Sequence, residues 1–176
     1  LESDPNFIQV VSCNTHNIAS LLKALSSENF YNVIQGDFTC IRRANDISQE
    51  GGFIASPEVG SHSNNMFGTH HAKDAYDLFA TMKQHPDIFS SALKVNTQYM
   101  HIIRFNIEVK GFSSRDDVIE KFENNKFIAL THKNIANKVF SFGRDHGYYG
   151  RIFNHTVVAL DSISTKSCQG NTRVTT

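Results

Sequence analysis

A cysteine and a histidine stand three residues apart where a helix is expected to begin. Cys13 and His16 lie in the stretch CNTHNIASLL, so both fall on the first turn of that helix. A thiolate at a helix N-terminus is stabilised by the partial positive charge there, and an imidazole can take its proton. A cysteine nucleophile also needs an orienting group and an oxyanion site, and the sequence names neither. The favoured interpretation is a structural or disulfide-bonded cysteine.

Three histidines gather in one polar segment, HSNNMFGTHH, as His62, His70 and His71. Imidazole is a common zinc ligand, but this spacing matches no ligand motif such as HExxH. A polar surface loop is favoured, and no metal site is predicted. The chain also lacks G-x-S-x-G, CxxC and a phosphate-binding loop.

Apolar periodicity predicts the elements that would position these residues. Helices are expected at 14–27, 71–84, 113–122 and 131–143, and the first of them places Ile18, Leu21, Leu22 and Leu25 on one face. Strands are expected at 7–12, 51–56, 97–112 and 151–164. Residues 31–51 show few periodic apolar positions and are expected to be irregular. The architecture predicted from this order is α+β.

The composition of the chain limits the classes of function that are expected. A chain of 176 residues is expected to form one domain, 1–176, and its 17 basic and 17 acidic residues favour neither nucleic acid nor an anionic membrane. No apolar run approaches the ~20 residues of a membrane span. Leu1 in place of Met suggests a trimmed or tagged start. Three cysteines permit at most one internal bridge, with Cys40–Cys168 as the candidate and three free thiols as the alternative.

Four stretches in order resemble the catalytic A subunits of the cholera and heat-labile enterotoxin family, which are mono-ADP-ribosyltransferases. They are FIQVVSCNTHNIASLL, GGFIAS, TQYMHIIRFNIEVKGFSSRDDVI and NHTVVALDSIS. The resemblance runs from Phe7 to about Ile163 and is one of pattern and order more than identity. It implies an ADP-ribosyltransferase-like fold, with two packed β-sheets around an NAD cleft and short peripheral helices.

The residues that would bind NAD and catalyse transfer in that family are replaced here. The family's NAD-orienting Arg falls on Gln9, and its Ser-Thr-Ser falls on Ala55, Ser56 and Pro57. Its two glutamates fall on Asn154 and Thr156, which carry no negative charge. Loss of one preorganised charge typically costs ~10²–10³-fold in rate. The resemblance therefore implies a frame whose chemistry is nearly gone.

The function predicted from this resemblance is that of a secreted, toxin-like or effector pseudoenzyme that binds a host or target protein. Tyr148 and Tyr149, in the glycine-flanked loop GRDHGYYG, are the candidate binding residues, and a mere turn is the alternative. Asn154 lies in the chain's Asn-x-Thr sequon, so a glycan there would block the cleft if the protein passes through a eukaryotic secretory route. NAD is allowed as a cofactor, although none is the favoured interpretation, and association with B subunits is unsupported.

Two alternatives stay open at this stage. An active mono-ADP-ribosyltransferase or NAD glycohydrolase could use a non-standard set made of Gln9, His155, Arg144 and Tyr148. An unrelated α+β interaction domain would also satisfy the pattern of helices and strands. Whether the chain is an enzyme is thus undecided from its sequence, with the balance toward no.

Overall fold

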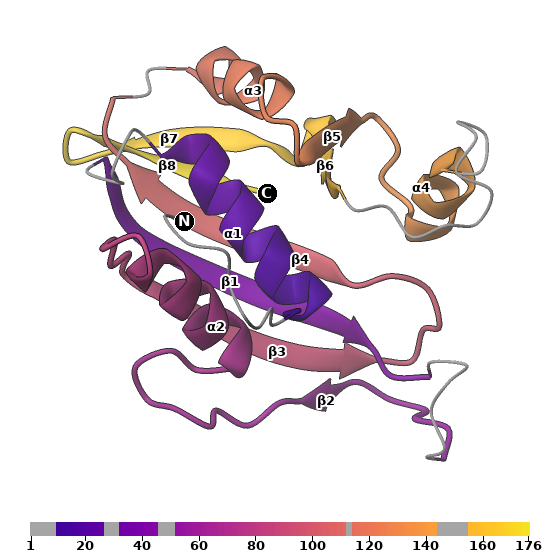
Figure 1. Cartoon of the computed structure of the whole chain (residues 1–176). Coiled ribbons are helices and arrows are strands. Elements are labelled where there is room, and N and C mark those ends of the chain that lie inside the picture. Colours follow the sequence, from indigo (N-terminus) through magenta and orange to yellow (C-terminus); the bar gives the residue numbers. More distant parts are fainter. Residues whose placement is uncertain (1–9, 27–31, 46–51, 112–113, 144–154) are drawn as a thin grey trace.

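A six-stranded sheet forms the centre of the molecule in the computed structural model, which describes residues 10–26, 32–45, 52–111, 114–143 and 155–176 (Figure 1). The strand order is β2-β3-β1-β4-β8-β7. These strands are β1 (Val33–Arg43), β2 (Glu58–Val59), β3 (Ile88–Val95), β4 (Ile102–Val109), β7 (Ser164–Cys168) and β8 (Asn171–Thr175). β1 and β3 run parallel, and the other described neighbours in this sheet run antiparallel.

Two helices cover one face of this sheet, α1 (Cys13–Leu25) and α2 (His70–Ala80), as Figure 1 shows. Ile18, Leu21, Leu22 and Leu25 of α1 are all buried, which confirms the predicted apolar face. Alternate residues of the strands meet them, because successive side chains of a strand point to opposite faces. The core so formed includes Phe38 and Cys40 of β1, Ala72, Ala75 and Phe79 of α2, and Phe105, Ile107 and Val109 of β4.

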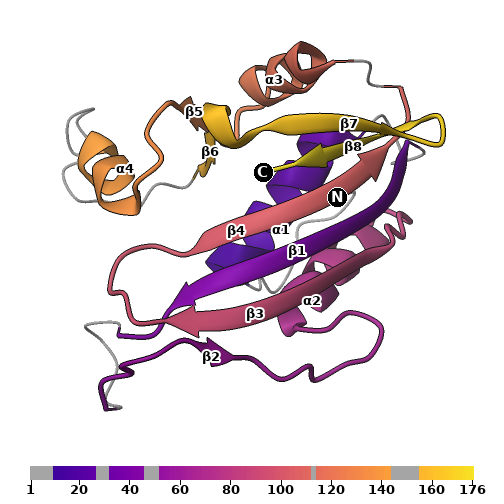
Figure 2. The same ribbon diagram turned by 180° about the vertical axis from the view of Figure 1, so that it is seen from behind.

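The other face of the sheet carries no helix in the described part of the chain, as the reverse view shows (Figure 2). Its residues include Gln35, Asp37 and Thr39 of β1, which alternate with the buried Gly36, Phe38 and Cys40. Polar side chains therefore dominate this face along β1. Antiparallel sheets tolerate such an arrangement, with one face on the core and the other in water.

Smaller elements lie beyond the β7 edge. Helix α3 (Arg115–Glu123) starts with a capping box between Ser114 and Asp117 and buries Val118 and Phe122. β5 (Ile128–Thr131) and β6 (Thr156–Ala159) form a parallel two-stranded sheet. The 3₁₀ turn η3 (Leu160–Ser162) follows β6, and the remaining helix is α4 (Ala136–Gly143). The four predicted helices thus all have counterparts.

Several local predictions were wrong. A strand was expected at 7–12, but its described residues, 10–12, form none, and Ser12 instead caps α1. Residues 31–51 were expected to be irregular, yet β1 runs from Val33 to Arg43 through the middle of the sheet. This half-buried strand is hard to recognise from the sequence. Gly36 and Asp37 are residue types that are rare in strands, and its end carries two charges, Arg42 and Arg43. Residues 52–56 were expected to form a strand but form none, and the two-residue β2 comes after Pro57.

The predicted fold class was also wrong. Two packed sheets around a cleft were expected, whereas the described chain has one large mixed sheet with α1 and α2 on a single face. The candidate Cys40–Cys168 bridge is not formed, since all three cysteines are free thiols. β1 and β7 are three strand spacings apart, about 14 Å, and a disulfide needs Cα atoms within about 7 Å.

Candidate active site at the start of α1

Helix α1 begins over the C-terminal end of β1, on the covered face of the sheet (Figure 1). Ser12 is its N-cap, and the Ser12 hydroxyl accepts a hydrogen bond from the backbone N–H of Thr15 at 3.3 Å. Cys13 is therefore the first helical residue, and its side chain is exposed. An anion formed at this place is stabilised by the partial positive charge of the helix start.

The Cys13 thiol lies beside an imidazole that comes from another part of the chain. Its Sγ is 3.6 Å from Nδ1 of His101, the residue before β4. Met100, immediately before, has a positive φ of 51°, which is uncommon for a residue other than glycine. Such backbone geometry clusters at functional sites. Here it turns the chain into β4 at the point where His101 meets the thiol.

A second imidazole, that of His71, is buried next to the cysteine. Its Nδ1 is 3.0 Å from the Ser12 hydroxyl, and its Nε2 is 3.3 Å from Nδ2 of Asn14. His71 is 3% exposed and Asn14 is 1% exposed. Burial, followed by the nearby charges of His70, Arg42 and His101, lowers the pKa of His71 to about 4. This ring is therefore neutral at physiological pH.

The start of α2 is fixed to β3, which is what places His71. Gly68 has a φ of 73°, and a Cβ there would lie 2.1 Å from the carbonyl oxygen of Ser90, so only glycine fits. Thr69 Oγ1 is 2.6 Å from Ser90 Oγ, and the N–H of Ala72 donates to the same hydroxyl at 3.1 Å. Ser90 is fully buried in β3 and so supplies the cap that Thr69 does not.

A cation and a second thiol lie under the start of α1. Arg42 shares the helix-covered side of β1 with Cys40, since the two are separated by one residue. The Nε of Arg42 is buried without a hydrogen-bond partner among the described residues. Burial raises the pKa of the Cys40 thiol to about 11, so Cys40 stays protonated. Cys13 is then the thiol available for reaction in this cluster.

The histidine that the sequence offered as a partner for Cys13, His16, does not contact it, and the favoured interpretation of Cys13 as a structural or disulfide-bonded residue is not supported, since its thiol is free and lies beside His101. The ring of His16 packs edge-on against Phe127, and its Nε2 is 3.5 Å from the Ser20 hydroxyl. His101 takes that place, but it lies 88 residues from Cys13 in the sequence. The one sequence signal that could have drawn attention to His101 is its place at the start of the strongest strand pattern in the chain.

The histidines of the HSNNMFGTHH segment separate into different surroundings. His62 packs edge-on against Phe89, while His70 and His71 are adjacent, with ring centroids 3.9 Å apart. Within the described residues, no three His, Cys, Asp or Glu side chains are grouped as a metal ion would require. None of the helices in that part of the chain is long and apolar enough to cross a bilayer.

The residues assigned by the toxin resemblance do not assemble into a cleft. Ala55 and Ser56 lie exposed in the segment before β2, at one edge of the large sheet. Thr156 is buried in β6, in the separate small sheet, and its hydroxyl donates to Asn17 Oδ1 at 2.8 Å. Gln9, Arg144, Tyr148, Tyr149 and Asn154 lie outside the described residues.

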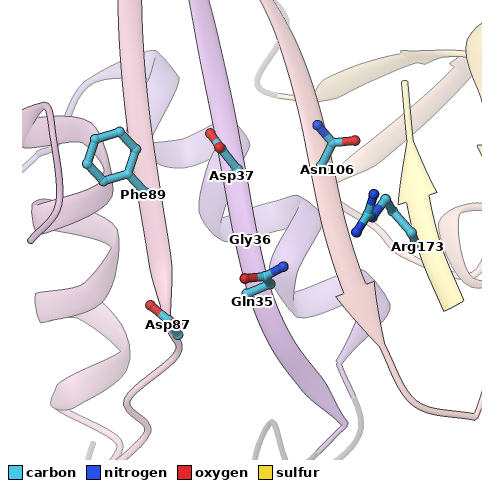
Figure 3. A pocket seen from close by; sticks show the side chains of 7 residues that line it. All are labelled: Gln35, Gly36, Asp37, Asp87, Phe89, Asn106 and Arg173. Carbon is cyan, nitrogen blue, oxygen red and sulfur yellow. The ribbon is translucent and has the colours of Figure 1, made fainter. Parts of the chain in front are cut away.

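A pocket of about 250 Å³ opens on the helix-free face (Figure 3). Its lining comes from β1, β4, β8 and the start of β3, namely Gln35, Gly36, Asp37, Asp87, Phe89, Asn106 and Arg173. Figure 3 shows Asp37 between Phe89 and Asn106, with Arg173 beyond Asn106. Because Asp37 points away from the face that holds Phe38 and Cys40, the sheet separates this pocket from Cys13.

Comparison with known proteins identifies several archaeal relatives of one name, glyceraldehyde-3-phosphate dehydrogenase. The protein of Sulfolobus acidocaldarius is 29% identical over 170 residues, which are 91% of this chain and 46% of the relative. That of Methanocaldococcus jannaschii is 27% identical over 165 residues, 90% of this chain and 46% of the relative. The chain thus spans about half the length of these curated relatives. No family model matches it.

These relatives overturn the interpretation based on enterotoxins. The similarity covers about nine tenths of the chain and points to dehydrogenases of metabolism. The predictions of a toxin family, a host-directed effector or pseudoenzyme role, and a secreted location are therefore wrong. NAD as a cofactor is compatible with dehydrogenase relatives, and the lean toward no cofactor finds no support in them. Binding of a partner protein stays a prediction.

Proposed function

We propose that this chain carries the thiol site of an aldehyde dehydrogenase that acts on a small phosphorylated aldehyde. The observation that supports this most directly is the 3.6 Å approach of Cys13 Sγ to His101 Nδ1 at the first turn of α1. A cysteine beside a histidine is the arrangement of an activated nucleophile. The printed name of the archaeal relatives supplies the substrate class.

The chemistry assigned to Cys13 and His101 balances as follows. His101 takes the thiol proton, and the Cys13 sulfur adds to the aldehyde carbon. His101 returns this proton to the oxyanion that forms, which gives a thiohemiacetal. Oxidation of the thiohemiacetal to a thioester on Cys13 would need a bound hydride acceptor, and His101 would then accept the hydroxyl proton. Attack by inorganic phosphate releases an acyl phosphate and restores the thiolate.

Arg42 is the group proposed to hold the phosphate of the substrate. Its Nε is buried and has no hydrogen-bond partner in the described chain, which leaves a guanidinium donor unused beside the site. Guanidinium groups bind phosphate oxygens through paired N–H donors. The start of α1 adds its own partial positive charge. A substrate with one phosphate and one aldehyde would then span Arg42 and Cys13.

A nicotinamide ring accepts the hydride in dehydrogenases and would supply that chemistry when bound. This chain contains no G-x-G-x-x-G sequence, and β1–β3 is the single parallel pair in its described large sheet. The residues at hand therefore do not fit the pyrophosphate of a dinucleotide. A dinucleotide that took part in this reaction would therefore have to be held by groups other than the described residues.

The test uses the reverse half-reaction, which needs no dinucleotide. The protein is incubated with acetyl phosphate, and the acetylated residue is located by mass spectrometry of proteolytic fragments. The expected result is a hydroxylamine-sensitive acetyl group on Cys13, with Cys40 and Cys168 unmodified as internal controls. Absence of acetylation, or equal acetylation of Cys13 and Cys168, would contradict the proposed function.

A further inference from the structure

We propose that His71 is a positioning residue that clamps the residues on both sides of Cys13, and that it neither binds the substrate nor transfers protons. This inference rests on the proposed function in one respect, since it takes Cys13 as the nucleophile. It assigns different roles to two adjacent histidines, because His70 is exposed while His71 is buried.

Both ring nitrogens of His71 are engaged by protein groups. Nδ2 of Asn14 can only donate, so Nε2 of His71 accepts that 3.3 Å hydrogen bond. The proton of the neutral ring is then on Nδ1, which donates to the Ser12 hydroxyl at 3.0 Å. Neither nitrogen is left for a substrate. Since Ser12 and Asn14 flank Cys13, one ring fixes both peptide units that carry the nucleophile.

The clamp links two elements that are otherwise separate in the sequence. Ser12 caps α1 through Thr15, and the start of α2 is fixed to β3 through Thr69 and Ser90. His71 joins these two anchored helix starts. Loss of its ring would free the first turn of α1 from α2 and β3. Cys13 would then keep its helix but lose its fixed distance to His101.

The surroundings of His71 maintain the neutral form that this bonding needs. The titratable and charged groups that face it are His70 on α2, Arg42 on β1 and His101 before β4, and all three disfavour a positive ring. Burial acts in the same direction. A protonated ring would also lose Nε2 as an acceptor for the amide N–H of Asn14, whose Oδ1 is buried without a hydrogen-bond partner among the described residues.

Cys13 alkylation by iodoacetamide tests the clamp without any substrate. His71→Phe keeps much of the ring volume and removes both hydrogen bonds, and alkylation should slow ~10–100-fold, as expected when a reacting group is misplaced by about 1 Å. His70→Phe is the matched control and should change the rate less than about twofold. Equal rates in the wild type and His71→Phe would overturn the proposal.

A pair of milder variants keeps the test decisive if His71→Phe fails to fold. His71→Gln retains an acceptor near the Nε2 site, whereas Ser12→Ala removes the partner of Nδ1. Each should slow alkylation, and the double variant should be no slower than the worse single one, because both remove the same hydrogen bond. Fully additive effects would mean that Ser12 and His71 act independently, which contradicts a clamp.

Nitrogen-15 NMR of the histidine rings separates a clamp from a substrate ligand. His71 should stay neutral with its proton on Nδ1 between about pH 5.5 and pH 8, a range in which an ordinary histidine titrates. Added inorganic phosphate should leave its signals unchanged. Titration of His71 in this range, or a shift with phosphate, would overturn the inference. These readouts hold even if acetyl phosphate fails to acylate Cys13, so the two proposals can fail separately.

Discussion

The two faces of the sheet each gather charged side chains, but only one of them brings reactive groups together. At the start of α1, Cys13 lies 3.6 Å from His101, and His71 bonds to Ser12 and Asn14, the two residues that flank Cys13. On the helix-free face, Asp37, Asp87 and Arg173 line a pocket without a nucleophile. Charge at a concave surface is therefore weaker evidence for chemistry than a thiol held against an imidazole.

Burial explains the difference between the two regions. Helices α1 and α2 exclude water from His71 and Cys40, so the pKa values of both shift, and the hydrogen bonds of His71 are held in one geometry. The pocket side chains stand on an uncovered sheet, where water solvates each charge separately. The helix layer thus creates the site as much as the reacting residues do.

Replacement of the nucleophile should give the largest effect. Cys13→Ser should reduce acylation by acetyl phosphate by at least ~10³-fold, because a hydroxyl is a far weaker nucleophile than a thiolate. Asp37→Asn, on the opposite face of the sheet, should leave the rate within about twofold of the wild type. Initial rates from intact-protein mass spectra check both. A comparable loss in the Asp37 variant would remove the distinction between the two faces.

Removal of the partner imidazole should follow. His101→Asn should lower the same rate ~10²–10⁴-fold, the usual contribution of a positioned acid–base group. The control is His132→Asn, since His132 is also a histidine paired with a neighbour, Asp161 at 3.2 Å, but it is exposed and distant in the fold. If both variants lost activity equally, the pairing with Cys13 would not be the cause.

Arg42 on the helix-covered face and Arg173 on the helix-free face allow anion binding on the two faces to be compared directly. Arg42→Gln should weaken the protection that glycerol 3-phosphate gives Cys13 against iodoacetamide by ~10–100-fold, the range expected for hydrogen bonds to a charged group. Arg173→Gln, in the pocket of the helix-free face, should leave this protection unchanged. If protection were lost in the Arg173 variant and kept in the Arg42 variant, the anion would bind on the helix-free face, which contradicts the proposal.

The buried histidine should make the stability of the protein depend on pH. The pKa of His71 is about 4 in the folded protein and about 6.5 when unfolded, so the unfolded chain binds more protons between these values. The free energy of unfolding should fall by about 2 kcal/mol from pH 7.5 to pH 5 on this account. Urea titrations measure it. His71→Gln should lose this part of the dependence, whereas His70→Gln should keep most of it, because burial is the largest cause of the lowered pKa of His71.

The smallest effects are expected on the helix-free face. Asn106→Ser and Gln35→Ser should each change the free energy of unfolding by about 0.5 kcal/mol or less, as is usual for exposed positions. Thermal unfolding checks this directly. A loss of several kcal/mol would show that the polar side chains of this face stabilise the fold. The two faces would then differ in their reactive groups but not in their importance for stability.

The helices of this fold could be predicted from the sequence, but most of the site could not. The spacing of Ile18, Leu21, Leu22 and Leu25 made α1 visible, because one apolar face suffices to define a helix. β1 was missed, and with it the place of Arg42 and Cys40 on the helix-covered side of the sheet, since Gly36 and Asp37 interrupt its pattern. Cys13 was considered as a nucleophile but interpreted as a structural or disulfide-bonded cysteine, because its partner lies 88 residues away and local spacing carries no information on such a contact.

The resemblance to enterotoxin subunits failed for a related reason. It compared the order of apolar segments, and many α+β chains share such an order without sharing a fold. That comparison contained no counterpart of β1, which is third in the order of the large sheet, or of the final hairpin formed by β7 and β8. The missing glutamates on Asn154 and Thr156 were thus interpreted as lost groups, although nothing in the structure requires a charge at Thr156, whose hydroxyl bonds to Asn17.

Gly68 bears on how this protein could diverge in evolution. A side chain at this position would collide with the Ser90 carbonyl. Substitutions of Gly68 are therefore not tolerated unless β3 moves as well. The backbone at Gly68 therefore fixes where His70 and His71 lie relative to Cys13, and substitutions at Gly68 can hardly change this placement. Descendants that acquired new substrates would be expected to vary the lining around Cys13 and to inherit this glycine unchanged.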